Sequence, residues 1–252
     1  MSLTAGNVPV TKTGGTAPQI ENSDITDTVG ISVSIGVPLI LPAGTTTTQP
    51  LKITNGTNLT TPVVNSIEND GINLYFTPTG TSRGCIPSKN FMALTSTNTM
   101  SSDAAQAIFN LGSSSGGGVT VATGVTYLFE LSLYLSSLSS TSGTFSLTFA
   151  TTGSIGSIGY TCIAQKIAAV NNPGATVSVN YINQATATII VAASTTTTGS
   201  IWCRGIIRMT TGGTLTPQIS ESTAATPVVA ANSYFLIHPI GSSIVTTIGN
   251  IV

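Results

Sequence analysis

The sequence predicts an all-β protein with an extended N-terminal arm, a small β region and a C-terminal antiparallel jelly-roll sandwich. Three observations support this fold class. Only 6% of the 252 residues are charged, against roughly 25% in ordinary globular proteins, and β-branched residues, which favour strands, are abundant. Apolar and polar residues alternate with a period of two through the second half of the chain. Strands and helices do not alternate, which excludes a parallel α/β fold.

The charge balance indicates an ordered chain that is packed against other subunits. Disordered chains combine low apolar content with high net charge, whereas this chain is 40% hydrophobic with a net charge of −1. A surface with so few charges is poorly soluble as a free monomer, because charge keeps proteins apart. We therefore expect association with copies of itself or with other proteins.

Composition also argues against several classes of partner. The seven basic residues are dispersed along the chain, so we expect no basic surface that binds a phosphate backbone. We therefore expect no nucleic-acid partner. The N-terminus lacks a basic segment followed by an apolar run, so we expect no secretory signal. The apolar stretch of residues 29–41 is too short for a membrane span and contains Pro38, so no membrane partner is expected.

The three cysteines are Cys85, Cys162 and Cys203. An odd count without C-x-x-C spacing predicts neither a disulfide framework nor a zinc site. We interpret them as free core thiols of a protein made in a reducing cytoplasm.

Three regions are predicted along the chain. Residues 1–50 form the extended arm, residues 51–111 form a small β-rich region with a strand at 72–76, and residues 119–252 form the sandwich. The boundary is placed at the linker LGSSSGGG, residues 111–118. Before it, residues 102–110 are the one place where a helical turn or two is expected, with Ser101 or Ser102 as its cap.

Nine strands are expected after the linker, and this number with regular turn signals suggests a jelly roll. Along the first of them, Tyr127, Phe129 and Leu131 share an inward face, and Glu130 and Ser132 share the outward face. The predicted strands cover residues 125–136, 144–150, 157–164, 175–182, 186–193, 200–210, 214–220, 233–239 and 244–251.

The search for catalytic or metal-binding residues predicts no enzyme, no cofactor and no metal. His238 is the only histidine and is interpreted as a strand histidine bonded locally, because a catalytic base needs a nucleophile and an orienting acid. Glu68 and Asp70 flank a turn, where acids serve the backbone, with a calcium site as the alternative. Glu130 and Glu221 are the only acids after residue 103, and nothing in the sequence brings them together.

The candidate site is a stripe on the strand of residues 200–210. Trp202, Arg204 and Arg208 share one face of this strand, and the opposite face has the apolar character of a core. Trp and Arg are enriched at interface hot spots. Two alternatives stay open, a sugar-binding surface and a solvated face on which the arginine stems cover Trp202.

Two parts of the chain resemble proteins of tailed bacteriophage particles. Residues 51–94, with NGTNLTTPVVNSIENDGINLYFTPTGTSRGCIP at their centre, resemble a repeat of tail and fibre proteins in which an NLTTP turn precedes a GA-E-DG-LYFT strand pair and a basic turn. Asn65 and Ser66 stand where Gly-Ala is usual. The C-terminal part is similar to a jelly-roll domain of phage virion proteins, through the segments TYLFELSLYL, GTFSLTFATTG, RGIIRMTTGGTLTPQISES and AANSYFLIHPIG.

The resemblance implies a non-enzymatic virion surface protein that is made in the host cytoplasm and forms a homotrimer. Its partners would be copies of itself and other virion proteins, such as the major capsid protein or tail proteins. A capsid cement or decoration protein is the first expectation, and a tail fibre or spike subunit that attaches to the host is the second. A module that binds a host-surface glycan is a further alternative.

Overall fold

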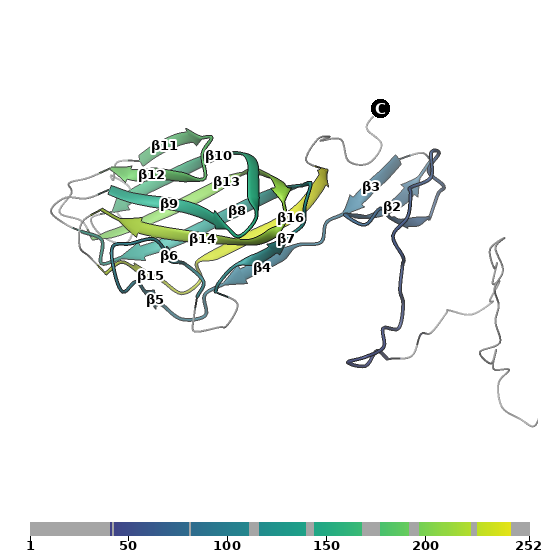
Figure 1. Ribbon diagram of the computed structural model, residues 1–252, viewed down its shortest axis with the longest axis horizontal. Helices are drawn as coiled ribbons and strands as arrows, with labels where there is room; N and C mark the ends of the chain where they lie inside the picture. The colour runs from purple at the N-terminus through teal and green to yellow at the C-terminus, as the bar shows by residue number, and fades with distance from the viewer. Residues whose placement is uncertain are drawn as a thin grey trace, which may run out of the picture. The chain divides into compact units, whose positions relative to one another are not determined.

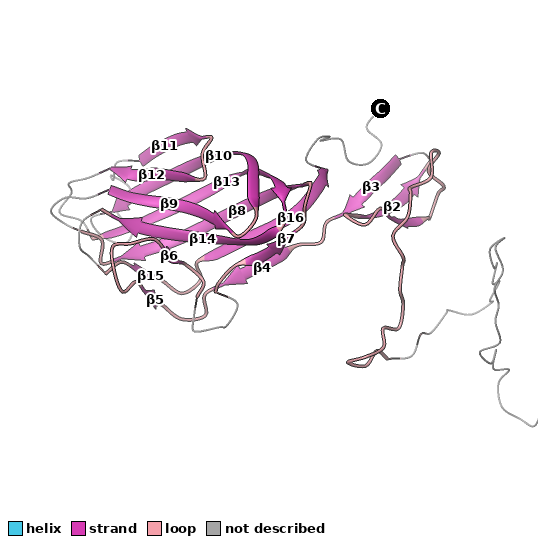
Figure 2. Cartoon of the chain, in the orientation of Figure 1, coloured by secondary structure: helices cyan, strands magenta, loops and turns pink. Residues whose placement is uncertain are grey.

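The computed structural model describes residues 41, 43–80, 82–110, 116–139, 144–167, 177–191, 197–222 and 226–242. These residues form strands joined by turns and loops, and none of them lies in a helix (Figure 2). The predicted all-β class is therefore confirmed. The chain divides into two units, Met1–Lys52 and Ile53–Val252, and each is considered by itself. Most of the predicted arm, residues 1–40 and 42, lies outside the described residues.

A three-stranded antiparallel sheet follows the first unit. It consists of β1 (Ile67–Asn69), β2 (Leu74–Thr79) and β3 (Ser82–Ile86), in the order β1-β2-β3. The strand predicted at residues 72–76 overlaps β2. Gly71 has a φ of 89° at the turn between β1 and β2, a conformation that glycine adopts without steric cost.

The remaining strands form two antiparallel sheets that pack face to face as a sandwich (Figure 1). The larger sheet has the order β11-β10-β13-β8-β15-β5, and β16 pairs with both β8 and β4. Its strands are β4 (Asn90–Ala93), β5 (Asn98–Thr99), β8 (Val125–Ser136), β10 (Ser154–Ile167), β11 (Val177–Ile182), β13 (Thr198–Thr211), β15 (Val228–Val229) and β16 (Tyr234–Ser242). The smaller sheet has the order β12-β9-β14-β6 with β7 also on β14. Its strands are β6 (Gln106–Ala107), β7 (Val119–Val121), β9 (Thr144–Thr151), β12 (Thr186–Val191) and β14 (Gly213–Glu221).

Eight of these strands pair in a nested order. In chain order they are β4, β7, β8, β9, β12, β13, β14 and β16. The first pairs with the last, the second with the seventh, the third with the sixth and the fourth with the fifth. Such rolled-up antiparallel pairing over two sheets is the connectivity of a jelly roll. The β10–β11 hairpin is inserted between the fourth and fifth strands and extends the larger sheet at one edge.

Strands that precede the predicted linker also belong to the sandwich. β4, β5 and β6 hydrogen-bond to β16, β15 and β14, respectively. The sandwich therefore takes strands from both sides of residues 111–118. Of this glycine-rich segment, Gly117 is described and is buried, and a Cβ there would lie 2.7 Å from the Asn110 nitrogen.

The helical turn predicted at residues 102–110 is wrong. Gln106 and Ala107 form β6, which pairs with Ile219 and Gln218 of β14. The Ile108 amide donates to the Pro217 carbonyl at 3.0 Å, and the Ile108 side chain is fully buried. Burial of Ile108 and bonding to β14 override the local helix preference, because tertiary contacts outweigh propensity in short segments.

Strand alternation locates most of the sandwich correctly. Eight of the nine strands predicted after the linker overlap a strand of the structure. The ninth, at residues 244–251, lies outside the described residues. The structure adds β7 and β15, which are too short to show a period of two.

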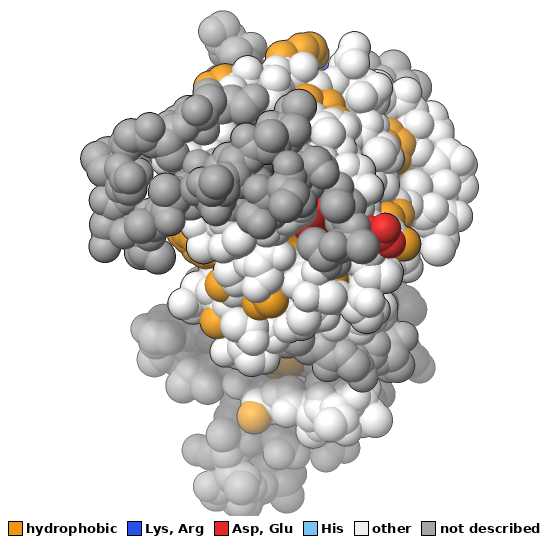
Figure 3. Space-filling view, turned by 90° about the vertical axis from the view of Figure 1, so that its left-hand side faces the viewer, with side chains coloured by type: hydrophobic (Ala, Val, Ile, Leu, Met, Phe, Trp, Pro, Cys, Tyr) orange, Lys and Arg blue, Asp and Glu red, His pale blue; other side chains and the backbone are white. Residues whose placement is uncertain are grey.

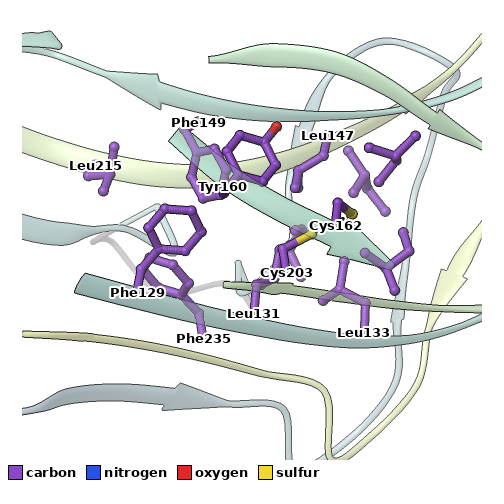
Figure 4. Close-up of a cluster of buried hydrophobic side chains, with 14 of the residues drawn as sticks. Phe129, Leu131, Leu133, Leu147, Phe149, Tyr160, Cys162, Cys203, Leu215 and Phe235 are labelled. Atoms are coloured by element: carbon purple, nitrogen blue, oxygen red, sulfur yellow. Dashed lines mark hydrogen bonds between the residues drawn. The ribbon is translucent and has the colours of Figure 1, made fainter. Parts of the chain in front are cut away.

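The core lies between the two sheets and is rich in aromatic rings (Figure 4). Phe129 packs against Phe149, Tyr160 and Phe235, with ring centroids 4.8, 5.7 and 6.2 Å apart. These distances are in the favourable range for aromatic pairs.

The cysteines are free, and two of them confirm the prediction of core thiols. Cys162 and Cys203 are fully buried between the sheets. Cys85 lies half-buried on β3, outside the sandwich core. Burial raises the pKa of Cys85, and the charge of Asp70 raises it further.

Replacing Gly205 by alanine is expected to destabilise the protein by about 1–3 kcal/mol, the usual cost of overpacking. A Cβ at this position of β13 would lie 2.3 Å from the Gly159 carbonyl oxygen and 2.6 Å from the Tyr160 Cα. Both atoms belong to the β10 backbone, which cannot move without breaking the β10–β13 ladder. Urea unfolding of Gly205→Ala tests this, with Gly56→Ala as the control, because a Cβ at Gly56 meets no atom within 4 Å. Equal midpoints would contradict the prediction.

Candidate functional site

The predicted stripe lies on the outer face of the larger sheet, the face that points away from the core. On β13, Trp202, Arg204 and Ile206 are exposed and Arg208 is half-buried. The alternate residues Ile201, Cys203, Ile207 and Met209 are buried in the core. The two faces predicted for this strand are therefore confirmed.

The strands beside β13 place Trp202 in a row of outward-facing residues that crosses the larger sheet. Ile163 of β10 is directly opposite Trp202, and Val179 of β11 is opposite Ile163. On the other side, Ser132 of β8 is opposite Trp202, and Tyr234 of β16 is opposite Ser132. Directly opposed side chains of antiparallel strands are in contact range. One continuous row therefore crosses five strands of the sheet.

Exposed apolar residues of the sandwich gather on this outer face. Among the described residues from β4 onward, each large hydrophobic side chain that is exposed belongs to a strand of the larger sheet. They are Phe91, Tyr134, Ile163, Val179, Tyr181, Trp202 and Ile206. Contiguous exposed apolar patches mark interaction sites more often than single exposed residues do. We call this set, together with Arg204, Glu130 and Tyr234, the aromatic face.

The outer face of the smaller sheet has a different chemistry. On β9 its outward residues are Thr144, Ser146, Thr148 and Ala150, and on β14 they are Thr214, Thr216, Gln218 and Ser220. The Ser146 and Thr188 hydroxyls are hydrogen-bonded at 3.2 Å. Hydroxyl and amide groups suit contact with water. The two outer faces of the sandwich therefore differ, one being apolar and the other polar.

Charged side chains are sparse on the described surface. Figure 3 shows orange hydrophobic groups and only a few acidic ones among the described residues on the side that faces the viewer. On the aromatic face, Arg204 of β13 is directly opposite Glu130 of β8. Opposite charges in such a cross-strand pair are favourable.

Glu130 also fixes an aromatic ring. The Tyr234 hydroxyl donates a short hydrogen bond to Glu130 Oε1. This bond, with burial as a second cause, raises the pKa of Tyr234 to about 12. Phe91 of β4 stacks on Tyr234 with ring centroids 5.6 Å apart. Tyr234 and Phe91 are therefore held in place before any partner arrives, which lowers the entropic cost of binding.

Arg208 differs from Arg204 in its surroundings. Its Nη1 donates to Thr126 Oγ1 at 3.0 Å, and the Thr126 hydroxyl donates to the Ser242 carbonyl at 2.6 Å. Arg208 therefore ties β13 to β8, whereas Arg204 is the more exposed of the two arginines.

His238 lies half-buried on β16, opposite Leu128 of β8. Its Nδ1 is buried and has no hydrogen-bond partner, so the local bond predicted for this residue is not made through that atom. Burial lowers the pKa of His238, and the charges of Lys89 and Arg204 lower it further. The folded structure therefore favours the neutral form of this histidine.

The lowered pKa predicts a stability loss on acidification. Above about pH 6.5, the ordinary histidine value, the histidine is neutral in both states. Below that value the unfolded chain binds a proton that the folded chain does not, so the free energy of unfolding decreases as the pH falls. His238→Gln is expected to flatten this decrease when urea midpoints are compared between pH 7.5 and 5.5. An unchanged slope in the variant would refute the assignment.

The acids near β1 and β2 have structural roles. Asp70 Oδ1 accepts the amides of Ile72 and Asn73 at 2.8 and 2.7 Å, and Oδ2 accepts the Tyr75 hydroxyl at 2.7 Å. Burial acts to raise the pKa of Asp70, but these hydrogen bonds outweigh burial and lower it. Glu68 Oε2 pairs with Arg83 Nε at 2.8 Å. Bonds within the protein occupy both carboxylates, which favours the turn interpretation over a calcium site.

The two C-terminal acids do not meet. Glu130 points outward on β8 of the larger sheet, and Glu221 is buried at the end of β14 in the smaller sheet. Glu221 Oε1 accepts the Ser139 amide at 2.7 Å. Across the ranges that the structure covers, no cluster of three or more histidine, cysteine, aspartate or glutamate residues is placed to hold a metal ion.

The sequence analysis missed several members of the aromatic face. Tyr134 could have been found, because alternation places it on the same outward side of its strand as Glu130 and Ser132. Tyr181 and Tyr234 lie on strands that were predicted, but the sheet order that brings them beside β13 and β8 is not visible in the sequence.

Comparisons with protein-family models, with curated proteins and with solved structures gave no match. Within the described part of the chain, no helix is long and apolar enough to span a membrane.

Proposed function

We propose that this chain is a non-enzymatic structural subunit that associates with copies of itself through the aromatic face. The observation that supports this proposal is the contrast between the outer faces of the sandwich, one with seven exposed large apolar side chains and the other with hydroxyl and amide groups. Burying apolar area contributes roughly 25 cal/mol per Å². Tyr, Trp, Phe and Arg are the residue types enriched in interface cores.

The size of the face suits a stable interface. It extends over β11, β10, β13, β8, β16 and β4, so it is about 24 Å wide at about 4.8 Å between strands. Along β13 its positions run from Ser200 to Arg208, about 26 Å at about 3.3 Å per residue. The product, about 600 Å², approaches the roughly 800 Å² that each partner buries in a standard interface.

The assembly that we propose is a homotrimer on the surface of a tailed-phage particle, where it acts as a capsid cement or decoration protein. The low charge of the chain and its resemblance to phage virion jelly rolls support this assignment. In this arrangement the aromatic face holds the subunits together, the hydroxyl-rich face is solvated, and the N-terminal arm contacts the major capsid protein.

A tail fibre or spike subunit is the second candidate. It is favoured by the segment that resembles a fibre repeat, because this segment forms a three-stranded sheet of its own with the Arg83–Glu68 ion pair. A glycan-binding surface has less support, because the cross-strand neighbours of Trp202 are Ile163 and Ser132 and not the amide and carboxylate groups that orient a sugar.

The oligomeric state tests the first part of the proposal. Light scattering coupled to gel filtration is expected to give three times the 25.5 kDa mass of the chain. A monomer at micromolar concentration would overturn self-association.

The location on the particle tests the second part. Antibody-bound gold against this protein is imaged by electron microscopy on intact virions. Gold over the head supports a cement protein, and gold confined to the tail replaces it with the fibre or spike. Particles without label would refute the virion assignment altogether.

A further inference from the structure

Cys162 and Cys203 face each other across two neighbouring strands of the core. They are directly opposed in the antiparallel ladder between β10 and β13. Their Sγ atoms lie 2.6 Å apart, and Figure 4 shows the two side chains next to each other in the core. Each residue is fully buried.

The backbone geometry at this pair already suits a covalent bond. Directly opposed residues of antiparallel strands have Cα atoms about 4.5 or 5.5 Å apart. Disulfides span Cα separations of about 4.4–6.8 Å. The register of β10 and β13 therefore brings the two cysteines within bonding range without any movement of the strands.

We propose that Cys162 and Cys203 form an intrachain disulfide that joins β10 to β13 when the protein folds under oxidising conditions. This inference is independent of the proposed function. The oxidant is a small-molecule disulfide such as oxidised glutathione. One cysteine thiolate attacks it and releases one glutathione thiolate. The second cysteine thiolate then attacks the mixed disulfide and releases the other, so two protein thiols are oxidised and one small disulfide is reduced to two thiols.

The bond forms before the sandwich closes. In the folded protein the adjacent Cys162 thiol and burial raise the pKa of Cys203, and a thiol that is not ionised is a poor nucleophile. An oxidant also has no access to fully buried sulfur atoms. The folded protein therefore keeps whichever redox state it had when the sheets came together.

The disulfide would connect residues 41 positions apart. The enclosed segment contains β11 and β12, an edge strand of the larger sheet and an edge strand of the smaller sheet, respectively. Closing a loop of this length restricts the unfolded chain, so the oxidised form is expected to unfold at a higher temperature than the reduced form.

The test uses the full chain with Cys85→Ser, which leaves only the proposed pair. The reduced, denatured chain is refolded with reduced and oxidised glutathione, and the folded product is alkylated in denaturant and weighed by mass spectrometry. We expect neither cysteine to be alkylated and the mass to be two hydrogens lower than that of the reduced, unalkylated chain. After prior reduction, both cysteines are expected to be alkylated. Two alkylated cysteines without reduction, or a mixed disulfide with glutathione on either, would overturn the proposal.

The wild-type chain provides the specificity control. Peptide mapping of its oxidised form is expected to show Cys162 linked to Cys203 and Cys85 alkylated. A link between Cys85 and either partner as the main product would contradict the proposal. Because both experiments keep Cys162 and Cys203, neither depends on core cysteine variants that could fail to fold.

Discussion

Replacing Phe129 by alanine is expected to lower the free energy of unfolding by about 3–5 kcal/mol. Phe129 is fully buried on β8, at the centre of the larger sheet. Its ring contacts Phe149 of the smaller sheet as well as Tyr160 and Phe235 of its own sheet. Removal of the ring leaves a cavity between the sheets that rigid strands cannot fill, so the lost transfer energy and the cavity cost add up.

Urea unfolding monitored by circular dichroism measures this loss at a fixed protein concentration, because association shifts apparent stability. Phe76→Ala is the matched control, since the same atoms are removed from a ring that is 37% exposed on β2. The control is expected to lose no more than about 1 kcal/mol. A loss below about 1 kcal/mol for Phe129→Ala would mean that the two sheets do not pack around this ring.

Replacing Trp202 by aspartate is expected to weaken self-association by about 2–4 kcal/mol, which corresponds to about 30- to 700-fold in the dissociation constant. Trp202 occupies the middle of the aromatic face, between Ile163 and Ser132. Association would bury a charged aspartate of the variant where the wild type buries an apolar ring, which is unfavourable. Sedimentation velocity over a concentration series measures the shift from oligomer to monomer.

The matched control is Thr188→Asp, which adds the same charge to the hydroxyl-rich face of the smaller sheet. It is expected to leave the oligomer unchanged. Tyr181→Asp serves as a second variant, because the Tyr181 side chain is 78% exposed and contributes little to the fold. If the two aromatic-face variants and the control all self-associate with the dissociation constant of the wild type, the aromatic face is not the interface.

The sequence located most of the long strands, because alternation is a local signal. The burial pattern of β8 follows the predicted inward and outward faces, including buried Phe129 and outward Glu130. On the strand of Trp202, alternation correctly predicts one outward face and one buried face. Each of these assignments needs only neighbouring residues and the period of an extended chain.

The short strands could not be predicted. β5, β6 and β15 have two residues each, so no alternation is present to detect. Gln106 and Ala107 are strand residues because β14 supplies the hydrogen-bond partners from more than a hundred residues away. The glycine-rich segment before β7 resembles a linker in composition, yet Gly117 is buried because it packs closely against the backbone of Phe109 and Asn110.

By itself, the sequence determined the all-β class, the low surface charge and the side of β13 on which Trp202, Arg204 and Arg208 lie. The tertiary structure alone decided which strands are neighbours. Nested pairing joins β4 to β16 and β8 to β13, and these non-local contacts depend on packing the whole core. That order assembles Phe91, Tyr181, Trp202 and Tyr234 into one face and brings Cys162 against Cys203. A period of two tells which way a side chain points, and only the closed sandwich determines what lies beside it.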